Sequence, residues 1–445
     1  MVKAGYAEHI LPVPAGQPLM GHTRDTYAAT GTHDPLYCKV ILWEHRQQFA
    51  GIIVLDLCMV DATFVQEVKT TIGLRSVLSG DTFLVSATHT HAGPAVFSLY
   101  EAPVMSVEVR SAIIDTIVDT VIEAYKSIEM VSLRYGSAPC NEKVGFYRRL
   151  RRKDGSTMMN WEAEAPSAVA GPLGTFDADV RILEIFGKYM HVCLVNYPLH
   201  PAILDYTNSL YSRDYPGYLE KALRQMVGSS LRVAFINGCC GNINHINYAD
   251  VDMPRRGYAA AQRVGYVLAT AAMEALRTAD AIHAHAVERV EKIVALQRIA
   301  VPQSLENRAR ETINAPKRGH QSETDGLPFA LQAPLILHLS EQQKKQLETT
   351  ISVTQLGPLS IFGFPGEMTF ELQQMLQQHV ADIPWFTIEL ADDAIGYIAH
   401  KEAYAQGGYE TQIGATRVAR GSGEQIVTEA LDLFRQFHNK LDNRT

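Results

Sequence analysis

Short apolar runs alternate with longer amphipathic segments along most of the 445 residues of this chain. Apolar runs of this kind predict strands, over residues 39–43, 51–56, 82–86, 180–186, 191–196, 233–237, 287–297, 351–356, 359–364 and 385–388. The amphipathic segments predict helices over residues 61–78, 106–127, 215–227, 255–278, 367–378 and 424–441. This alternation favours an α/β fold.

Turn residues and polar stretches subdivide the pattern. Gly357-Pro358 separates two apolar runs and predicts a hairpin turn. Asp214 directly precedes a predicted helix and is a natural N-cap. Residues 302–332 are polar and interrupted by Gly, so we expect a mobile excursion or lid there. The sequence shows no internal repeat, and its length allows two domains or one large elaborated domain.

Composition and charge exclude several classes of function. Hydrophobic residues make up 47% of the chain and charged residues 20%, which suits a globular enzyme with a sizeable core. The net charge is −8 and no basic stripe occurs, so nucleic acid is not expected as a partner. Without a secretory signal or an apolar run long enough to span a membrane, we expect a cytoplasmic protein without stable membrane association. The six cysteines lack CxxC spacing, which predicts buried free thiols.

The strongest chemical signal is the segment 86–94 (SATHTHAGP), which follows the apolar run 82–85. His89 and His91 are separated by one residue, and residues i and i+2 of an extended backbone share a face. Both imidazoles can therefore point into one cavity at the end of the strand. Neutral imidazole is the commonest metal ligand and binds zinc readily. We predict a metal site here; the alternative is a pair of surface histidines in a loop.

Further short motifs follow in a fixed order from about Gly31 to Glu410. They are GTHDPL (31–36), VLDL (54–57), THTHAGP (88–94), FYRR (146–149), YPLH (197–200), SRDYPGY (212–218), NGCCGN (237–242), FPGE (364–367), GY (396–397), EAY (402–404) and YE (409–410). In this order and spacing the chain resembles the N-terminal catalytic domain of the neutral/alkaline non-lysosomal ceramidases, which are zinc-dependent amidases. The resemblance implies one large catalytic domain over residues 1–445, with mixed twisted β-sheets packed by helices.

The resemblance also implies a ligand set. In the family, zinc is held by two histidines, a glutamate and a tyrosine. By motif position these are His89, His200, Glu367 and Tyr397, with Glu367 at the start of a helix and Tyr397 after Gly396. Two imidazoles and a carboxylate form a catalytic zinc set that leaves room for water. A phenolate ligand needs a lowered pKa, which a bound dication provides.

Other residues receive roles from the same motifs. His91 is then the proton shuttle beside the metal, and Arg148 binds a substrate oxygen. Tyr409 matches a family tyrosine that polarises the scissile carbonyl. Asn244 and His33 are expected to line the substrate site. The implied reaction is attack of metal-activated water on an amide carbonyl, with the oxyanion stabilised by zinc and Tyr409.

The chain departs from the family in one motif and in its length. The family's GDVSPN element carries a serine at the active centre, whereas this chain has Asn242 and Asn244 at the aspartate and serine positions. Asparagine is no nucleophile, so the zinc–water route is favoured over an acyl-enzyme. We expect no counterpart of the family's C-terminal immunoglobulin-like domain after the last predicted helix. We therefore expect a small or soluble amide substrate rather than ceramide.

Each assignment has a structural alternative. Glu367 could complement a helix dipole in the first turn, and Arg148 lies in a charge run that by default is a solvated face. His33 and Asp34 could fix the turn before Pro35. Asp56 ends an apolar strand and could orient a metal-bound histidine.

Other functions also remain open at this level. One is an esterase of the same fold, and another is a binding protein that kept the fold without activity. A third is an HxH metallohydrolase of another fold. Metallo-β-lactamases would need Asp-His after the HxH, where this chain has Ala92-Gly93-Pro94, and a TIM barrel does not accommodate the hairpin at Gly357-Pro358. A homo-oligomer is compatible with the sequence.

Overall fold

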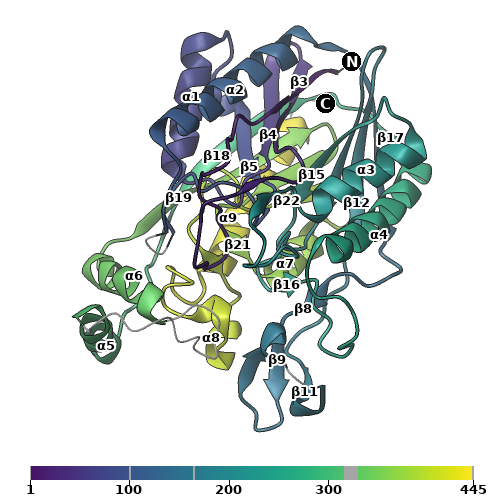
Figure 1. Cartoon of the computed structure of the whole chain (residues 1–445). Coiled ribbons are helices and arrows are strands. Elements are labelled where there is room, and N and C mark those ends of the chain that lie inside the picture. The colour runs from purple at the N-terminus through teal and green to yellow at the C-terminus, as the bar shows by residue number, and fades with distance from the viewer. Residues whose placement is uncertain (1, 100–101, 164–165, 315–328, 443–445) are drawn as a thin grey trace.

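Three mixed sheets form the framework of the molecule (Figure 1). A computed structural model describes residues 2–99, 102–163, 166–314 and 329–442. The first sheet, in the order β5-β4-β3-β1-β6, contains β1 (Lys3–Ile10), β3 (Tyr37–His45), β4 (Gln48–Leu55), β5 (Phe83–Ala87) and β6 (Glu129–Met130). Its neighbouring strands are antiparallel except for β4 and β5, which are parallel.

The other two sheets also combine antiparallel strands with one parallel pair. The second, in the order β15-β13-β12-β7-β17, contains β7 (Ser132–Pro139), β12 (Asp179–Phe186), β13 (His191–Tyr197), β15 (Arg232–Asn237) and β17 (Asp280–Ile282). The third, in the order β18-β19-β20-β22, contains β18 (Val287–Leu296), β19 (Leu347–Leu356), β20 (Leu359–Gly363) and β22 (Trp385–Ile388). The pairs β13–β15 and β20–β22 are parallel, and the other pairs are antiparallel.

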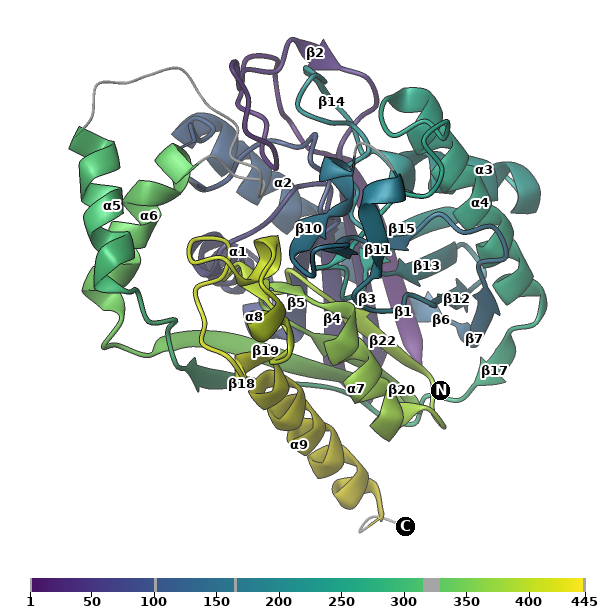
Figure 2. The ribbon, with the colours of Figure 1, turned by 90° about the horizontal axis from the view of Figure 1, so that it is seen from below.

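The three sheets share one order of connections. In each, three antiparallel strands are followed by a crossover helix, a strand parallel to the third, and a second helix. The crossover helices are α1 (Ala62–Arg75), α3 (Tyr215–Val227) and α7 (Phe370–Val380), and the second helices are α2 (Val107–Lys126), α4 (Tyr258–Arg277) and α9 (Ser422–Asp442). Each helix pair packs on the outside of its own sheet (Figure 2). The fold thus contains a structural repeat that the sequence does not display.

A shared apolar core joins the three sheets. Its buried side chains come from the parallel strands of all three, for example Ile52, Leu194 and Phe386. A hydrogen-bonded side chain reinforces it, because the Asn196 amide donates to the carbonyls of Ile236 and Thr387 at 2.9 Å each. The segments that follow the parallel strands are thereby brought to one place.

Smaller elements surround this framework. They are the sheet of β9 (Arg149–Arg152), β10 (Thr157–Met159) and β11 (Val169–Pro172), the strand pairs β2 (Gly31–Thr32) with β14 (Leu210–Tyr211), β8 (Phe146–Tyr147) with β16 (Ile243–Asn244) and β21 (Glu367–Met368) with β23 (Tyr397–Ile398), the helices α5 (Gln303–Asn314), α6 (Phe329–Gln342) and α8 (Ala403–Gln406), and the 3₁₀ turns Gly80–Thr82, Asn160–Glu162, Pro166–Ala168 and Tyr409–Thr411. None of the helices in the described ranges combines the length and apolar character needed to span a membrane.

Most predicted elements are confirmed. Each predicted strand and helix has a counterpart, and Gly357-Pro358 forms the hairpin turn between β19 and β20, with Gly357 at a φ of 59°. Asp214 caps α3, accepting a hydrogen bond from the Tyr215 amide at 2.6 Å. All six cysteines are free thiols.

Two predictions about local structure differ from the structure. Glu367 does not open a helix: it lies in β21, and α7 begins three residues later at Phe370. Pairing with β23 outweighs the local helical pattern here. The predicted excursion 302–332 contains α5 and the start of α6, which pack on each other through Ala309 and Ala333. Residues 315–328 lie outside the described residues.

Candidate metal centre

The candidate centre lies where segments from the three sheets meet. His89 follows β5, His200 follows β13, and Glu367 follows β20. All three residues are at least 98% buried. One residue from each sheet therefore reaches a common buried point, as expected when the ends of three parallel strand pairs converge on one core.

The two histidines are held in defined orientations. His89 Nδ1 lies 3.0 Å from Glu389 Oε1, and His200 Nδ1 lies 2.9 Å from the carbonyl oxygen of Cys240. Both acceptors require a proton on Nδ1, which leaves the lone pair on Nε2 of each ring. His89 adopts this position at a φ of 73°, a conformation that non-glycine residues rarely adopt and that is concentrated at functional sites.

The Nε2 atoms of both rings face the carboxylate of Glu367. Glu367 Oε2 lies 3.0 Å from His200 Nε2 and 3.8 Å from His89 Nε2, and His89 Nε2 has no hydrogen-bond partner. The lone pair of each Nε2 atom and the Glu367 carboxylate repel each other at these distances, and a cation between them would remove this repulsion. Neighbouring ligands of a tetrahedral zinc ion with bonds of about 2.0–2.1 Å are about 3.3 Å apart. The residues therefore fit a zinc ion, with Glu389 and the main-chain carbonyls orienting the histidines.

Tyr397 is brought to Glu367 by strand pairing. Glu367 and Tyr397 are register partners in the parallel pair β21–β23, so their side chains share a face. Burial and the Glu367 carboxylate raise the pKa of the Tyr397 phenol, and the Arg148 guanidinium acts against them. For Tyr397 to act as a phenolate ligand, its pKa must be lowered. A bound dication would lower it.

Arg148 is part of the centre rather than of a solvated face. It is only 4% exposed, and its Nε donates to Glu410 Oε1 at 2.7 Å. Its Nη1 lies 3.4 Å from His200 Nε2, while Nη2 has no hydrogen-bond partner. The guanidinium carbon lies 5.2 Å from the Tyr397 ring centre and 5.9 Å from that of Tyr409. One N–H group of this fixed cation is therefore available to a ligand oxygen.

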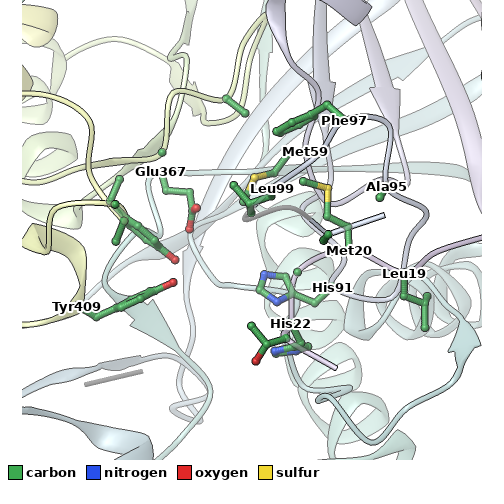
Figure 3. Close-up of a pocket in the computed structure, with 18 of the residues that line it drawn as sticks. Leu19, Met20, His22, Met59, His91, Ala95, Phe97, Leu99, Glu367 and Tyr409 are labelled. Carbon is green, nitrogen blue, oxygen red and sulfur yellow. The ribbon is translucent and has the colours of Figure 1, made fainter. Parts of the chain in front are cut away.

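A cavity of about 80 Å³ opens beside these residues. Figure 3 shows Glu367 and Tyr409 on one side, His91 and His22 on the other, and apolar side chains above and beside His91. This apolar wall consists of Leu19, Met20, Met59, Ala95, Phe97 and Leu99. The cavity thus joins the polar centre to a surface suited to a hydrocarbon group.

His91 lies in the cavity wall with both ring nitrogens unpartnered. Burial lowers its pKa well below the usual value, and the neighbouring His22 and His89 act in the same direction. The imidazole is therefore neutral at neutral pH, so that it can accept a proton before it donates one.

Two predicted substrate residues lie outside this arrangement. His33 stacks on Tyr258 at 3.9 Å and contacts the Tyr218 hydroxyl at 3.1 Å, in a separate surface cavity beside α3. Asn244 exchanges hydrogen bonds of 2.6 and 2.8 Å with Asn160, so its amide is already engaged. Asp56 accepts a hydrogen bond from the Tyr37 amide and does not contact His89.

The carboxylate that orients His89 is Glu389, which the sequence reasoning missed. Glu389 accepts from His89 Nδ1, from the Cys240 thiol at 2.9 Å and from the Cys240 amide at 3.0 Å. Glu410, also missed, is fully buried between Arg148 and Arg149. For Glu389 a signal existed, because a carboxylate directly after a buried strand needs a partner.

Comparisons with known proteins identify a family and a fold. The family model "Neutral/alkaline non-lysosomal ceramidase, N-terminal" matches residues 9–257. The crystal structure of neutral ceramidase from Pseudomonas aeruginosa is similar, with a TM-score of 0.72 and 17% identity, over 97% of this chain and 73% of that one. A ceramidase structure complexed with C2 gives a TM-score of 0.70 and 17% identity, over 96% and 74%. No curated protein matches the chain in a sequence search. The mixed α/β architecture predicted from the sequence is therefore confirmed as the fold of these structures.

Proposed function

Because the chain belongs to the neutral/alkaline non-lysosomal ceramidase family, we propose that it is a zinc-dependent hydrolase that cleaves the amide bond of a small or soluble N-acyl compound. Family and fold support hydrolysis of an amide bond. The zinc ion and the size of the substrate are our proposal. The observation that carries it is the position of the buried Glu367 carboxylate, whose Oε2 lies 3.0 Å from His200 Nε2 and 3.8 Å from His89 Nε2.

The proposed ligands are His89, His200, Glu367 and Tyr397. A bound zinc ion would lower the pKa of a water molecule and polarise the amide carbonyl. The residues of the chain supply the remaining interactions. Arg148 binds an oxygen of the substrate through its unpartnered Nη2. Tyr409, in the cavity wall, donates a hydrogen bond to the carbonyl oxygen as negative charge develops on it.

Cleavage of an amide also needs a proton on the leaving nitrogen. A ring nitrogen of His91 is the proposed carrier, because His91 lines the cavity opposite Tyr409 and its nitrogens have no other partner (Figure 3). The neutral imidazole takes a proton as the water attacks and passes it to the amine. Asn244 offers no nucleophile, and its amide is held by Asn160, which supports attack by water over an acyl-enzyme.

The cavity favours a modest acyl group. Its volume of about 80 Å³ is well below the roughly 300–1,000 Å³ of pockets that enclose drug-sized ligands. The wall formed by Met20, Met59 and Phe97 is apolar and lies beside the polar centre. A short apolar acyl chain against this wall places its carbonyl near Tyr409. Ceramide, with long chains on both sides of the amide, fits this volume less well.

The test combines metal analysis with a substrate panel. We expect about one zinc ion per chain, and loss of hydrolysis on chelation with recovery on adding zinc. The panel contains N-acyl amines of increasing acyl length, ceramide, and esters matched to the best amide. His89→Ala should lose activity, while His285→Ala, at an exposed position away from the centre, should keep it.

The outcomes separate the alternatives. A metal-free protein that is fully active would contradict the zinc proposal, and faster cleavage of the matched ester would favour an esterase. Turnover by neither wild type nor His89→Ala would favour a binding protein. A preference for ceramide over the short amides would contradict the proposed substrate size.

A further inference from the structure

Cys58 lies at a position that recurs in all three copies of the structural repeat. In each sheet one residue follows the end of the third antiparallel strand at nearly the same interval. After β13, which ends at Tyr197, this residue is His200; after β20, which ends at Gly363, it is Glu367. In the first sheet, β4 ends at Leu55, and the corresponding residue is Cys58. The first repeat therefore presents a thiol where the other two present proposed metal ligands.

The geometry at Cys58 is that of a ligand group. Cys58 Sγ, one nitrogen of His89 and one nitrogen of His91 all lie within 4.8 Å of one another. Cys58 and His89 are fully buried, and His91 is 8% exposed. Neither ring nitrogen of His91 has a hydrogen-bond partner, and neither does His89 Nε2. Buried imidazole nitrogens are normally paired, so unpartnered ones facing a thiol indicate a missing ligand.

We propose that Cys58, His89 and His91 form a second, inhibitory binding site for a thiophilic divalent cation such as Cd²⁺ or excess Zn²⁺. One thiolate and two imidazoles form a set that soft and borderline cations prefer. On binding, the sulfur–metal bond replaces the S–H bond of Cys58, and the proton leaves to the buffer.

The two sites share one ligand and exclude each other. His89 Nδ1 is committed to Glu389, so His89 has a single nitrogen to give. A cation held by Cys58 therefore removes His89 from the set with His200 and Glu367. It also occupies His91, the proposed proton carrier. Cys58 itself has no part in the proposed reaction, so its replacement spares the hydrolytic machinery.

The binding test does not need activity. The chelator-treated full-length protein is titrated with Cd²⁺, and the ultraviolet sulfur-to-cadmium charge-transfer band is followed. Wild type should develop this band, and Cys58→Ala should lose it, with binding weakened about tenfold or more. Cys193→Ala, a matched change of a buried cysteine in another core, should keep the band. Thermal melting of each variant verifies folding, and Cys58→Ser provides a second replacement.

Two results would overturn the inference. The first is a full band in both folded Cys58 variants. The second is loss of the band in Cys240→Ala but not in Cys58→Ala, which would assign the cation to the neighbouring group of His89, His200 and Cys240.

A second arm rests on the proposed function. In the zinc-loaded enzyme, Cd²⁺ should inhibit wild-type hydrolysis, and Cys58→Ala should need about tenfold more Cd²⁺ for the same inhibition. Equal inhibition of both would contradict the shared use of His89. If no amide is hydrolysed at all, the proposed function fails while the spectroscopic result still decides the binding site.

Discussion

Glu389 connects the two proposed histidine ligands. Its Oε1 atom lies 3.0 Å from His89 Nδ1 and accepts the Cys240 thiol at 2.9 Å, and the same sulfur lies 3.1 Å from His200 Nδ1. A carboxylate hydrogen-bonded to a ligand histidine fixes the ring and raises its basicity. The Glu389 carboxylate is fully buried. We therefore expect its role to be that of holding this hydrogen-bond network in place.

We therefore predict that Glu389→Gln weakens metal binding. The amide keeps the shape of the side chain but loses the charge, and its NH₂ group faces a donor of Cys240. Zinc affinity, measured by competition with a chelator, should fall about 10–100-fold. Glu402→Gln, an exposed change of the same kind, should leave it unaltered. Unchanged affinity in Glu389→Gln would show that the carboxylate does not support the ligand.

At the scale of elements, the position of β21 decides whether Glu367 reaches its partners. Gly241 packs against this strand so closely that a Cβ atom would lie 2.6 Å from the carbonyl oxygen of Glu367 and 2.8 Å from that of Met368. Backbone atoms cannot move aside independently, so a side chain at position 241 must displace β21.

Gly241→Ala should therefore reduce metal affinity although it removes no ligand. The measurement is zinc binding by the folded variant, with folding verified by circular dichroism. Gly73→Ala in α1 is the control, because nothing lies within 4 Å of its added Cβ. That change should stabilise the helix by up to about 1 kcal/mol. Wild-type zinc affinity in Gly241→Ala would mean that β21 tolerates the shift.

The cap of α3 gives a prediction about pH. Asp214 adopts a φ of 57° and accepts hydrogen bonds from the amides of Ile203, Leu204 and Tyr215. Burial raises its pKa from 3.8 to about 6, against the effect of these hydrogen bonds. Because the folded-state pKa is the higher one, its contribution to stability is fully present below about pH 4 and is lost as pH rises to about 6.

Asp214→Asn removes this titration while keeping a side chain that tolerates the same backbone conformation. Unfolding in urea from pH 4 to pH 8 should show wild type losing stability relative to the variant between about pH 4 and 6. The change should be on the order of 3 kcal/mol for about two pKa units. A difference that does not vary with pH would contradict the raised pKa.

Local sequence patterns predicted the strands and helices better than they predicted which residues meet at the candidate metal centre. Buried strands and amphipathic helices carry their own periodicity, and a Gly-Pro turn marks its hairpin. Helix α5 lacked this signal because Ala309 is its one buried residue among those described. The helix start expected at Glu367 was wrong because pairing of β21 with β23 is a tertiary contact. His89 and His200 meet only through packing of separate sheets, so their proximity came from family resemblance and not from spacing.

At the scale of the whole molecule, the centre takes His89 from the first sheet, His200 from the second and Glu367 from the third. The repeat escaped the sequence analysis because the sheets share connections without shared residues: a histidine, a glutamate and a cysteine occupy comparable places. The proposed cation at this centre would link all three sheets, and only the folded chain would bind it.

Zinc should therefore stabilise the entire fold. At a free concentration about 100 times the dissociation constant, the gain is about 2.7 kcal/mol. The melting temperature should rise with zinc and fall with chelator in wild type. His89→Ala should lose most of this response. Equal melting temperatures with and without zinc in wild type would show that no such link forms.

This distribution of ligands has a consequence for biogenesis. A chain still emerging from the ribosome has His89 and His200 long before Glu367, which lies beyond β20 in the last sheet. Amino-terminal fragments that stop short of that sheet would lack the carboxylate, however well they collapse. Acquisition of the proposed cation, and with it the onset of hydrolysis, would thus be deferred until the third sheet has been synthesised.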